Sequence, residues 1–476
     1  MTYAQRFRRT KIVATLGPAS GNEKTIRSMI DAGVNVFRVN SSHGTVDERV
    51  EMMELVHQLR TELNVYVGLL VDLQGPRIRI GQLAEPLELV SGSEIVFAPE
   101  QSAALGEIAT TYGELARDVT EGARILLDDG LLVAEARKVE GDRVLATVVH
   151  GGVLHSYKGM NLPGVHVSAP AVTDKDREDI DIATRHHADF LGISFVRREA
   201  DVDCVRELVS DRLLLVAKIE KMAALNHLEE IIKKADVVMV ARGDLGVELP
   251  FEEVPLAQKR VIANAISWGK PVITATQMLE SMVHSPRPTR AEASDVANAI
   301  LDGTDAVMLS AETAIGEYPV EAVDAMARII REIERAGAGV RAGKGRRDDR
   351  APTEGSYDVE TAIAAATCAA AEMLDVPLIV CFTKSGFTPK KVSSNRPTTP
   401  ILGLSTEPTT CCQLSIVWGV FPELAARAPN YEKMLGIARA TLIEKGYVKK
   451  GDRIVVTAGV PFDVPGTTNL LKVEVV

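Results

Sequence analysis

A lysine and two carboxylates follow two apolar runs in the middle of the chain. Lys218 and Glu220 come after the run Leu213–Val216, and Asp244 comes after the run Asp236–Val240. Charged groups at the ends of buried strands cost free energy unless they hold a metal ion or a ligand. Two carboxylates suit a divalent cation, and an added ammonium group suits a dianionic phosphoryl group. The residues therefore predict metal-assisted phosphoryl transfer.

The elements that would position these groups are two parallel strands joined by a helix. Each unbroken apolar run is typical of a strand covered on both faces, and residues 222–235 have helical spacing of apolar side chains. In such a unit the two strand ends are neighbours. Two alternatives are surface ion pairs and an integrin-binding Arg-Gly-Asp loop at 242–244. Both charged strings lie where a buried strand ends, and this position favours a metal or ligand site.

The same alternation of strand and helix runs through most of the chain. Because eight such units are predicted, we expect an α/β protein built on a closed (β/α)8 TIM barrel, with its chemistry at the carboxyl ends of the strands. The expected strands begin at Lys11, Val34, Val65, Asp189, Leu213, Asp236, Pro271 and Ala306. The polar residues expected at their carboxyl ends are Arg38, Asn40, Asp72, Lys218, Glu220, Asp244 and Thr276.

Two further regions interrupt or follow the barrel pattern. After the third strand, short runs separated by Gly and acidic turns predict an antiparallel β insertion that covers the barrel mouth as a lid. A Gly, Arg and Ala-rich connector contains Gly-Lys but no Walker motif, and a smaller C-terminal α/β domain follows it. The expected limits are 1–72 and 170–338 for the barrel, 73–169 for the lid, 339–354 for the linker and 355–476 for the C-terminal domain.

Composition bounds the kinds of partner. The chain has 476 residues, of which 46% are hydrophobic and 25% charged, and its formal net charge is −11. This charge argues against general binding to nucleic acid or anionic membranes and favours a small molecule. The five cysteines are scattered without a CxxC pair, and neither a signal peptide nor a membrane-spanning run is present. We therefore expect a cytoplasmic protein.

Long motifs spread over the chain resemble the pyruvate kinase family. They are TKIVATLGPAS, FRVNSSHG, LVDLQGPRIR, KGMNLPG, AKIE, VARGDLGVE, TATQMLESM and LSAETAIGEYP, in family order from Thr10 onward. The resemblance implies a glycolytic enzyme that forms pyruvate and ATP from phosphoenolpyruvate and ADP. It also implies a catalytic barrel, a lid, an allosteric C-terminal domain and a homotetramer.

The resemblance implies roles for the charged residues. Glu220 and Asp244 would hold the essential magnesium, or manganese, and Lys218 would neutralise the transferring phosphoryl group and the enolate. Arg38 would hold the substrate phosphate, and Thr276 would lie near the enolate face where a proton is taken up. Arg38, Lys218 and Thr276 would thus be catalytic.

The resemblance also implies two binding sets. The substrate-binding residues would be Arg38, Lys218, Gly243 through its backbone N–H, Asp244 and Thr276. The nucleotide-binding residues would be Asn40, Ser41, Ser42, His43, Arg79 and Lys158, with Lys158 reaching from the lid.

The potassium site of many family members is altered. Its ligands would correspond to Asn40, Ser42, Asp72 and the carbonyl of Leu73, but here leucine replaces a threonine and Arg77 replaces a glutamate. We hypothesise that the Arg77 guanidinium supplies positive charge near Asp72, so that potassium is not needed. The alternative is a surface substitution that leaves cation use unchanged.

A loop of the C-terminal domain resembles the family's site for a phosphorylated effector. Its residues are Thr383, Lys384, Ser385, Gly386 and Thr388, and their hydroxyl and backbone N–H groups suit an anion. A strand-to-helix turn without a ligand fits the same pattern equally well.

Two other functions remain as alternatives. A magnesium-dependent lyase or aldolase acting on a pyruvate enolate would share the metal carboxylates and an arginine, but it would not need a lid that carries Arg79 and Lys158. A metabolite sensor without catalytic activity would be expected to lack Lys218 or one of the carboxylates. The presence of all these groups favours the kinase.

Overall fold

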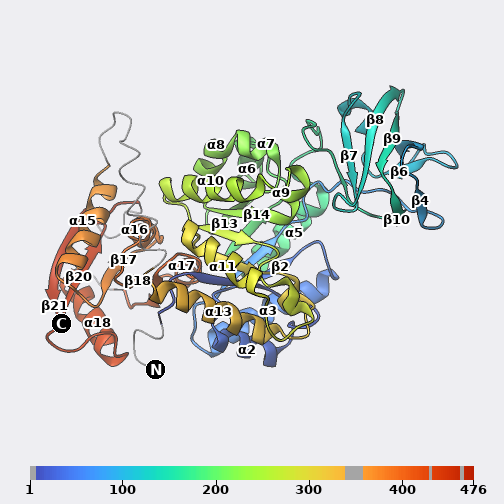
Figure 1. The fold of residues 1–476 in the computed structure, drawn as a ribbon. Helices are drawn as coiled ribbons and strands as arrows, with labels where there is room; N and C mark the ends of the chain where they lie inside the picture. Colours follow the sequence, from blue (N-terminus) through green and yellow to red (C-terminus); the bar gives the residue numbers. More distant parts are fainter. Residues whose placement is uncertain (1–6, 338–357, 428–430, 461–465) are drawn as a thin grey trace.

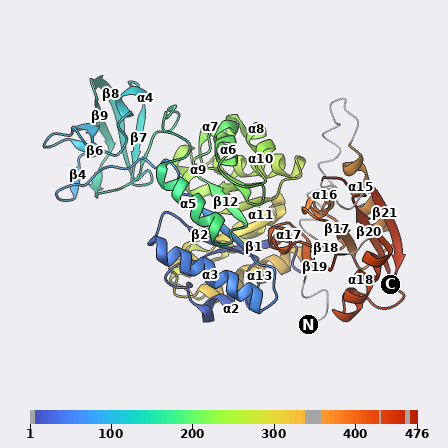
Figure 2. The ribbon, with the colours of Figure 1, turned by 180° about the vertical axis from the view of Figure 1, so that it is seen from behind.

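Three bodies follow one another in space (Figures 1 and 2): the C-terminal domain, a central barrel and an inserted β domain. The computed structural model describes residues 7–337, 358–427, 431–460 and 466–476. The predicted linker, 339–354, lies outside the described residues. Among the helices in these ranges, none combines the length and the apolar character needed to cross a membrane.

The central body is a closed barrel of eight parallel strands, which confirms the predicted fold. Their order is β1-β16-β15-β14-β13-β12-β3-β2, and nearly all of their residues are buried because helices cover the outside. The strands are β1 (Lys11–Thr15), β2 (Val36–Asn40), β3 (Gly68–Asp72), β12 (Phe190–Ile193), β13 (Leu214–Ile219), β14 (Val237–Ala241), β15 (Val272–Ala275) and β16 (Ala306–Leu309).

The helices around the barrel begin and end at residues that the sequence marks. Before α2, Asn22 accepts a hydrogen bond from the N–H of Thr25 and caps the helix, and after it Gly33 adopts φ +116° and ends it. The larger outer helices are α2 (Glu23–Ala32), α3 (Val46–Glu62), α5 (Asp174–Arg185), α6 (Glu199–Arg206), α10 (Val254–Ser267), α11 (Arg290–Asp302) and α13 (Pro319–Arg335).

Two segments near the predicted site differ from expectation. Residues 222–235 form two helices, α7 (Met222–Asn226) and α8 (Leu228–Lys234), because His227 adopts a backbone conformation outside the helical region. The charged string after β14, for which the sequence predicts no helix, forms α9 (Arg242–Glu248). This short helix contains two glycines and has no side-chain cap, so tertiary contacts must hold it.

The inserted domain has its own apolar core around Phe97 and Ile125, and in Figure 1 it extends away from the barrel. Its six-stranded sheet has the order β11-β7-β8-β9-β5-β6, and β10 pairs with β4. One pair, β5 with β6, is parallel, which the antiparallel prediction missed. The strands are β4 (Leu87–Leu89), β5 (Glu94–Pro99), β6 (Ile108–Thr110), β7 (Arg124–Leu127), β8 (Leu132–Glu140), β9 (Arg143–His150), β10 (Gly152–Leu154) and β11 (Met160–Asn161).

The C-terminal domain is a five-stranded sheet with helices. Its order is β19-β18-β17-β20-β21, and only the β20–β21 pair is antiparallel. The strands are β17 (Ile379–Phe382), β18 (Ile401–Ser405), β19 (Val420–Leu424), β20 (Arg453–Ala458) and β21 (Leu470–Val475). The helices are α15 (Val359–Met373), α16 (Phe387–Ser393), α17 (Pro408–Leu414) and α18 (Tyr431–Glu444).

The barrel interior and the C-terminal domain share one apolar cluster. Val13, Val216 and Met239 from the barrel belong to the same buried cluster as Ile416 and Val417, which follow α17. The C-terminal domain therefore closes the amino-terminal end of the barrel, opposite the strand ends expected to carry the chemistry.

Lys11 lies fully buried at this junction. Its Nζ donates a hydrogen bond of 2.6 Å to the carbonyl oxygen of Val420, and it lies 4.5 Å from the centre of the Phe421 ring. Burial, with a contribution from the charge of Arg8, lowers the pKa of Lys11 from 10.5 to about 7. The folded protein therefore releases this proton at a much lower pH than the unfolded chain.

We expect Lys11 to make stability depend on pH. Between the folded and unfolded pKa values the unfolded chain binds one more proton, so stability rises with pH. Relative to Lys11→Met, the wild-type free energy of unfolding should increase from pH 7 to pH 10 by at most about 1.4 kcal/mol per pH unit. Urea unfolding of both proteins at several pH values measures this difference. A difference that does not change with pH would contradict the expectation.

Candidate functional site

A cavity of about 730 Å³ opens at the carboxyl ends of the barrel strands. It collects polar groups from most of the strands, so the predicted convergence occurs. Predicted site residues that line it are Arg38, Asn40, His43, Asp72, Lys218, Glu220, Asp244 and Thr276.

A charged network occupies the floor of this cavity. Lys218 Nζ lies 2.8 Å from Glu220 Oε1 and 3.3 Å from Asp72 Oδ1, and it donates a hydrogen bond of 2.8 Å to Ser194 Oγ. Arg38 contacts the other oxygen of Asp72 twice, at 2.7 Å from Nε and 2.6 Å from Nη2. Two cations thus share Asp72, which is only 1% exposed.

The network fixes the charge states of its members. Burial raises the pKa of Asp72, but the charges of Lys218 and Arg38 outweigh burial and hold the pKa below its ordinary value. Burial lowers the pKa of Lys218, but Asp72 and Glu220 reverse this effect and raise the pKa overall. Lys218 therefore stays protonated and presents a positive charge to the cavity.

Glu220 and Asp244 fit a divalent cation. Glu220 is 1% exposed, and burial together with the charge of Asp244 raises its pKa. The half-buried carboxylate of Asp244 lines the cavity, and none of the described residues forms a hydrogen bond or ion pair with it. Two close carboxylates, one of them without a partner, match the hard oxygen ligands that magnesium and manganese prefer.

Thr276 lies on a strained turn after β15. Thr276 and Gln277 have φ values of +66° and +52°, a conformation that costs free energy for residues other than glycine. Thr276 Oγ1 accepts a hydrogen bond of 2.8 Å from the N–H of Gly243. The N–H expected to meet the substrate carboxylate is therefore bonded to Thr276 in this structure.

Arg242 holds the strained turn against α9. Its guanidinium donates to the carbonyl oxygens of Ala275, Thr276 and Gln277, at 3.2, 2.6 and 3.3 Å. It also forms an ion pair of 2.8 Å with Asp295 on α11. Arg242 thus connects α9, which carries Asp244, to the turn that carries Thr276. We regard it as a positioning residue.

Replacing Arg242 should impair the reaction without removing a reacting group. For Arg242→Gln we expect kcat to fall between about 10- and 100-fold, because a shift of about 1 Å in a reacting group has that effect. The family resemblance implies that a proton is taken up near Thr276, so exchange of the methyl protons of pyruvate with solvent should also slow. Arg242→Lys should recover part of both rates.

Asp295→Asn is the matched control, because it removes the same ion pair but leaves the three carbonyl contacts of Arg242. It should keep near-normal kcat and proton exchange. If Arg242→Gln and Asp295→Asn lost kcat and proton exchange equally, Arg242 would have a role in stability alone.

The predicted nucleotide residues are only partly brought together. Asn40 and His43 line the cavity, whereas the carbonyl of buried Ser41 accepts hydrogen bonds from Arg49 and Lys175. The backbone N–H of Ser42 donates to Asn40 Oδ1.

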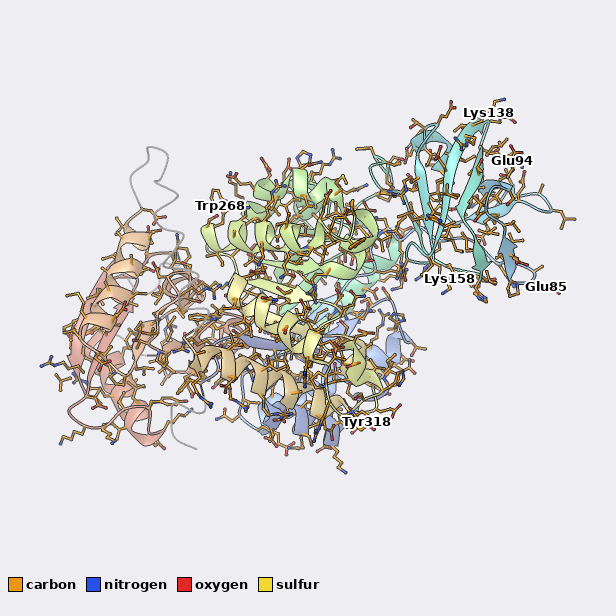
Figure 3. All side chains as sticks on the ribbon, viewed as in Figure 1. Glu85, Glu94, Lys138, Lys158, Trp268 and Tyr318 are labelled. Carbon is orange, nitrogen blue, oxygen red and sulfur yellow. The ribbon has the colours of Figure 1, made fainter. Side chains whose placement is uncertain are left out.

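Arg79 and Lys158 belong to the inserted domain and pair within it. Arg79 donates to the carbonyl oxygen of Tyr157 at 2.8 Å, and Lys158 lies 2.7 Å from Asp128. Figure 3 shows Lys158 on the edge of that domain. Burial and the charges of Arg77, Arg38 and Arg79 lower the pKa of His43, so this flank of the cavity is electropositive. An anion would be favoured there.

Two groups of the expected potassium site, Asp72 and the carbonyl of Leu73, already contact other side chains. Asp72 is engaged by Arg38 and Lys218, and the carbonyl oxygen of Leu73 accepts from Ser194 Oγ at 2.7 Å. Arg77 lies 3.8 Å from Asp129 of the inserted domain. The structure therefore pairs Arg77 with Asp129, and the charges that hold the pKa of Asp72 low are those of Lys218 and Arg38.

The predicted effector loop joins β17 to α16. The N–H of Gly386 donates to Thr383 Oγ1, and buried Thr388 is hydrogen-bonded to Thr468 at 2.8 Å. Lys384 and Ser385 are exposed. The loop's hydroxyl groups therefore point in different directions, and two of them are used within the domain.

Sequence reasoning missed three contributors to the site: Ser194, Phe195 and Arg242. Ser194 bonds Lys218, and the N–H of Phe195 donates to Glu220 at 2.6 Å. Both residues follow β12, so the rule that chemistry lies at strand ends could have identified them. No sequence signal reveals the contacts of Arg242.

The fold and the cavity define a (β/α)8-barrel enzyme with a lysine, an arginine and a pair of carboxylates at the strand ends. The model of the pyruvate kinase barrel domain matches residues 7–323, and that of the pyruvate kinase alpha/beta domain matches residues 361–474. The chain belongs to the pyruvate kinase family.

Individual relatives agree with this assignment. The chain is 45% identical to pyruvate kinase 2 of Synechocystis sp., over 98% of this chain and 79% of the relative. It is 44% identical to pyruvate kinase of Geobacillus stearothermophilus, over 98% and 80%. A crystal structure of a pyruvate kinase from Cryptosporidium parvum has a TM-score of 0.93 at 32% identity, and the match covers 100% of this chain and 97% of that one.

Proposed function

We propose that the protein transfers the phosphoryl group of phosphoenolpyruvate to ADP with the help of magnesium. The observation that carries this proposal is the convergence of Lys218, Glu220 and Asp244 on one cavity. Glu220 and Asp244 would hold the metal ion. When bound, the ion would neutralise charge on the substrate oxygens.

The protein's own groups divide the remaining work. Lys218 and Arg38 present positive charge where the phosphoryl group would lie, and Asp72 holds both side chains in place. Positioning and charge neutralisation are the main demands of phosphoryl transfer. Thr276, fixed by Gly243 and Arg242, lies on the cavity wall where the enolate would take up a proton. Arg79 and Lys158 would reach the nucleotide phosphates if the inserted domain closed over the mouth.

We further propose that the enzyme does not require potassium. Asp72 is ion-paired with Arg38 and Lys218, the carbonyl oxygen of Leu73 accepts a hydrogen bond from Ser194, and an arginine stands at position 77. In this proposal Arg77 adds positive charge beside Asp72 once the inserted domain closes.

A coupled assay of pyruvate formation tests both proposals. Product should require phosphoenolpyruvate, ADP and magnesium or manganese together. Exchanging potassium for tetramethylammonium at constant ionic strength should leave the rate nearly unchanged. A many-fold activation by potassium would refute potassium independence, and product formation without ADP would instead favour a lyase.

Regulation and assembly are proposed on the family resemblance. The loop 383–388 would bind a phosphorylated effector, and four copies of the chain would assemble. A titration in which no phosphorylated metabolite changes the cooperativity of phosphoenolpyruvate saturation would exclude the effector.

A further inference from the structure

The floor of the catalytic cavity is divided into a charged half and an apolar half. The charged side chains come from three strands: Arg38 lies on β2, Asp72 on β3 and Lys218 on β13. The strands β14, β15 and β16 are neighbours in the barrel order and face the same cavity. They form the apolar half, to which they contribute Met239, Ala241, Ala275 and Met308.

Two methionines dominate the apolar half. Met239 is 0% exposed and Met308 is 2% exposed, although both line the cavity. Both belong to the buried cluster whose other members, such as Val216, fill the barrel beneath the cavity. Because a protein interior is close-packed, neither side chain can withdraw from the cavity without displacing its neighbours. The apolar half is therefore a surface of fixed depth.

The groups that border the apolar half are polar but differ in charge. Thr276 follows Ala275, and its hydroxyl donates to the carbonyl oxygen of Ala275 at 2.7 Å and accepts from the N–H of Gly243. Ser310, which follows β16, adds a second hydroxyl to the cavity wall. Asp244, after β14, is the nearest carboxylate in sequence, and it is one of the two suited to the metal ion. A ligand would thus meet charge on one side of the floor and thioether and methyl groups on the other.

Resting on the proposed function, we infer that the apolar half binds the methylene carbon of the enol phosphate, and that Met239 and Met308 restrict the substrate to enol phosphates with an unsubstituted methylene group. The cations and the metal ion attract the phosphate and carboxylate groups. The methylene group is the one apolar end of the molecule, and its contact with thioether and methyl groups removes apolar surface from water. A methyl group added to this carbon would overlap a methionine side chain.

The probe for this inference is 2-phosphonooxybut-2-enoate, which is phosphoenolpyruvate with one methyl group added to the methylene carbon. When it reacts, an oxygen of ADP bonds to phosphorus as the bond between phosphorus and the enol oxygen breaks. The methyl-bearing carbon then takes up a proton, and the product is 2-oxobutanoate. ATP formation measures the reaction of both substrates. Since one carbon in a closed apolar pocket changes kcat/KM about 10- to 200-fold, the wild-type enzyme should prefer phosphoenolpyruvate by a factor in this range.

Shortening either methionine should relax this preference. In Met308→Ala the ratio of the two kcat/KM values should fall about 10-fold or more toward the larger substrate, because the truncated side chain leaves room for the added methyl group. Met239→Ala should act in the same direction. Both values of the ratio are measured on the same protein, so a smaller folded fraction cancels. Met326→Ala is the matched control, because Met326 is fully buried on α13 and does not line the cavity, and it should keep the wild-type preference.

The outcomes separate this inference from the proposed function. A shift in either cavity variant that Met326→Ala lacks supports the inference. Equal use of both substrates by the wild type, an unchanged ratio in both cavity variants, or the same shift in Met326→Ala would overturn it. If the alanine variants do not fold, Met308→Val, a smaller truncation with a side chain that strands favour, must shift the ratio in the same direction, and an unchanged ratio would be equally decisive. Wild-type protein that forms no ATP from phosphoenolpyruvate would instead refute the proposed function.

Discussion

Lys218→Met is expected to lower kcat by about 100- to 1,000-fold, the usual effect of removing one group that stabilises charge in a transition state. Lys218 Nζ contacts Glu220 and Asp72 at the floor of the cavity, and these carboxylates keep it protonated. Methionine preserves most of the side-chain volume but removes the charge. Steady-state kinetics should therefore show a loss in kcat that exceeds any change in the KM for phosphoenolpyruvate.

The control for this substitution is Lys221→Met, three residues along the chain. Lys221 forms an ion pair of 2.7 Å with Glu248 and does not line the catalytic cavity. The Lys221→Met variant should keep most of the wild-type activity. Near-normal turnover in Lys218→Met would remove the central assignment, whatever the family of the chain.

Glu220→Gln is expected to have the second large effect. The substitution keeps the shape of the side chain and an oxygen that can accept from Phe195, but it removes one of two carboxylates suited to a metal ion. Loss of residues that merely support metal ligands costs about 10- to 100-fold in metal affinity or activity, so loss of a ligand should cost at least that much. The concentration of magnesium needed for half-maximal rate should rise accordingly.

Glu51→Gln provides the comparison for Glu220→Gln. Glu51 is an exposed carboxylate on the rim of the same cavity, so its removal changes the local charge by the same amount. Its magnesium dependence should stay near that of the wild type. Equal magnesium curves for Glu220→Gln and the wild type would show that Glu220 does not bind the ion.

Much of the catalytic cavity could be predicted because strand geometry leaves few choices. Apolar runs identify buried parallel strands, and the residue after each run must lie at the barrel rim. This reasoning correctly grouped Lys218, Glu220 and Asp244 around one cavity. Local sequence was sufficient here because the geometry of a buried strand determines which residues lie at the rim.

The remaining features depend on contacts between distant segments. The turn at Thr276 has a backbone conformation that its residue type disfavours, and it exists because Arg242 holds it from another element. Helix α9 likewise lacks a side-chain cap, and Arg242 at its start holds it through contacts with the Thr276 turn and Asp295. The burial of Lys11 requires a domain more than 400 residues away in sequence.

The apolar cluster that joins the barrel interior to the residues after α17 has a consequence for how the protein comes apart. Met239 and Met308 belong to this cluster and also line the catalytic cavity, so the cluster runs the length of the barrel. Heating should therefore melt the barrel and the C-terminal domain as one cooperative unit, while the inserted domain, with its own core, can melt independently. The three domains should therefore unfold as only two cooperative units.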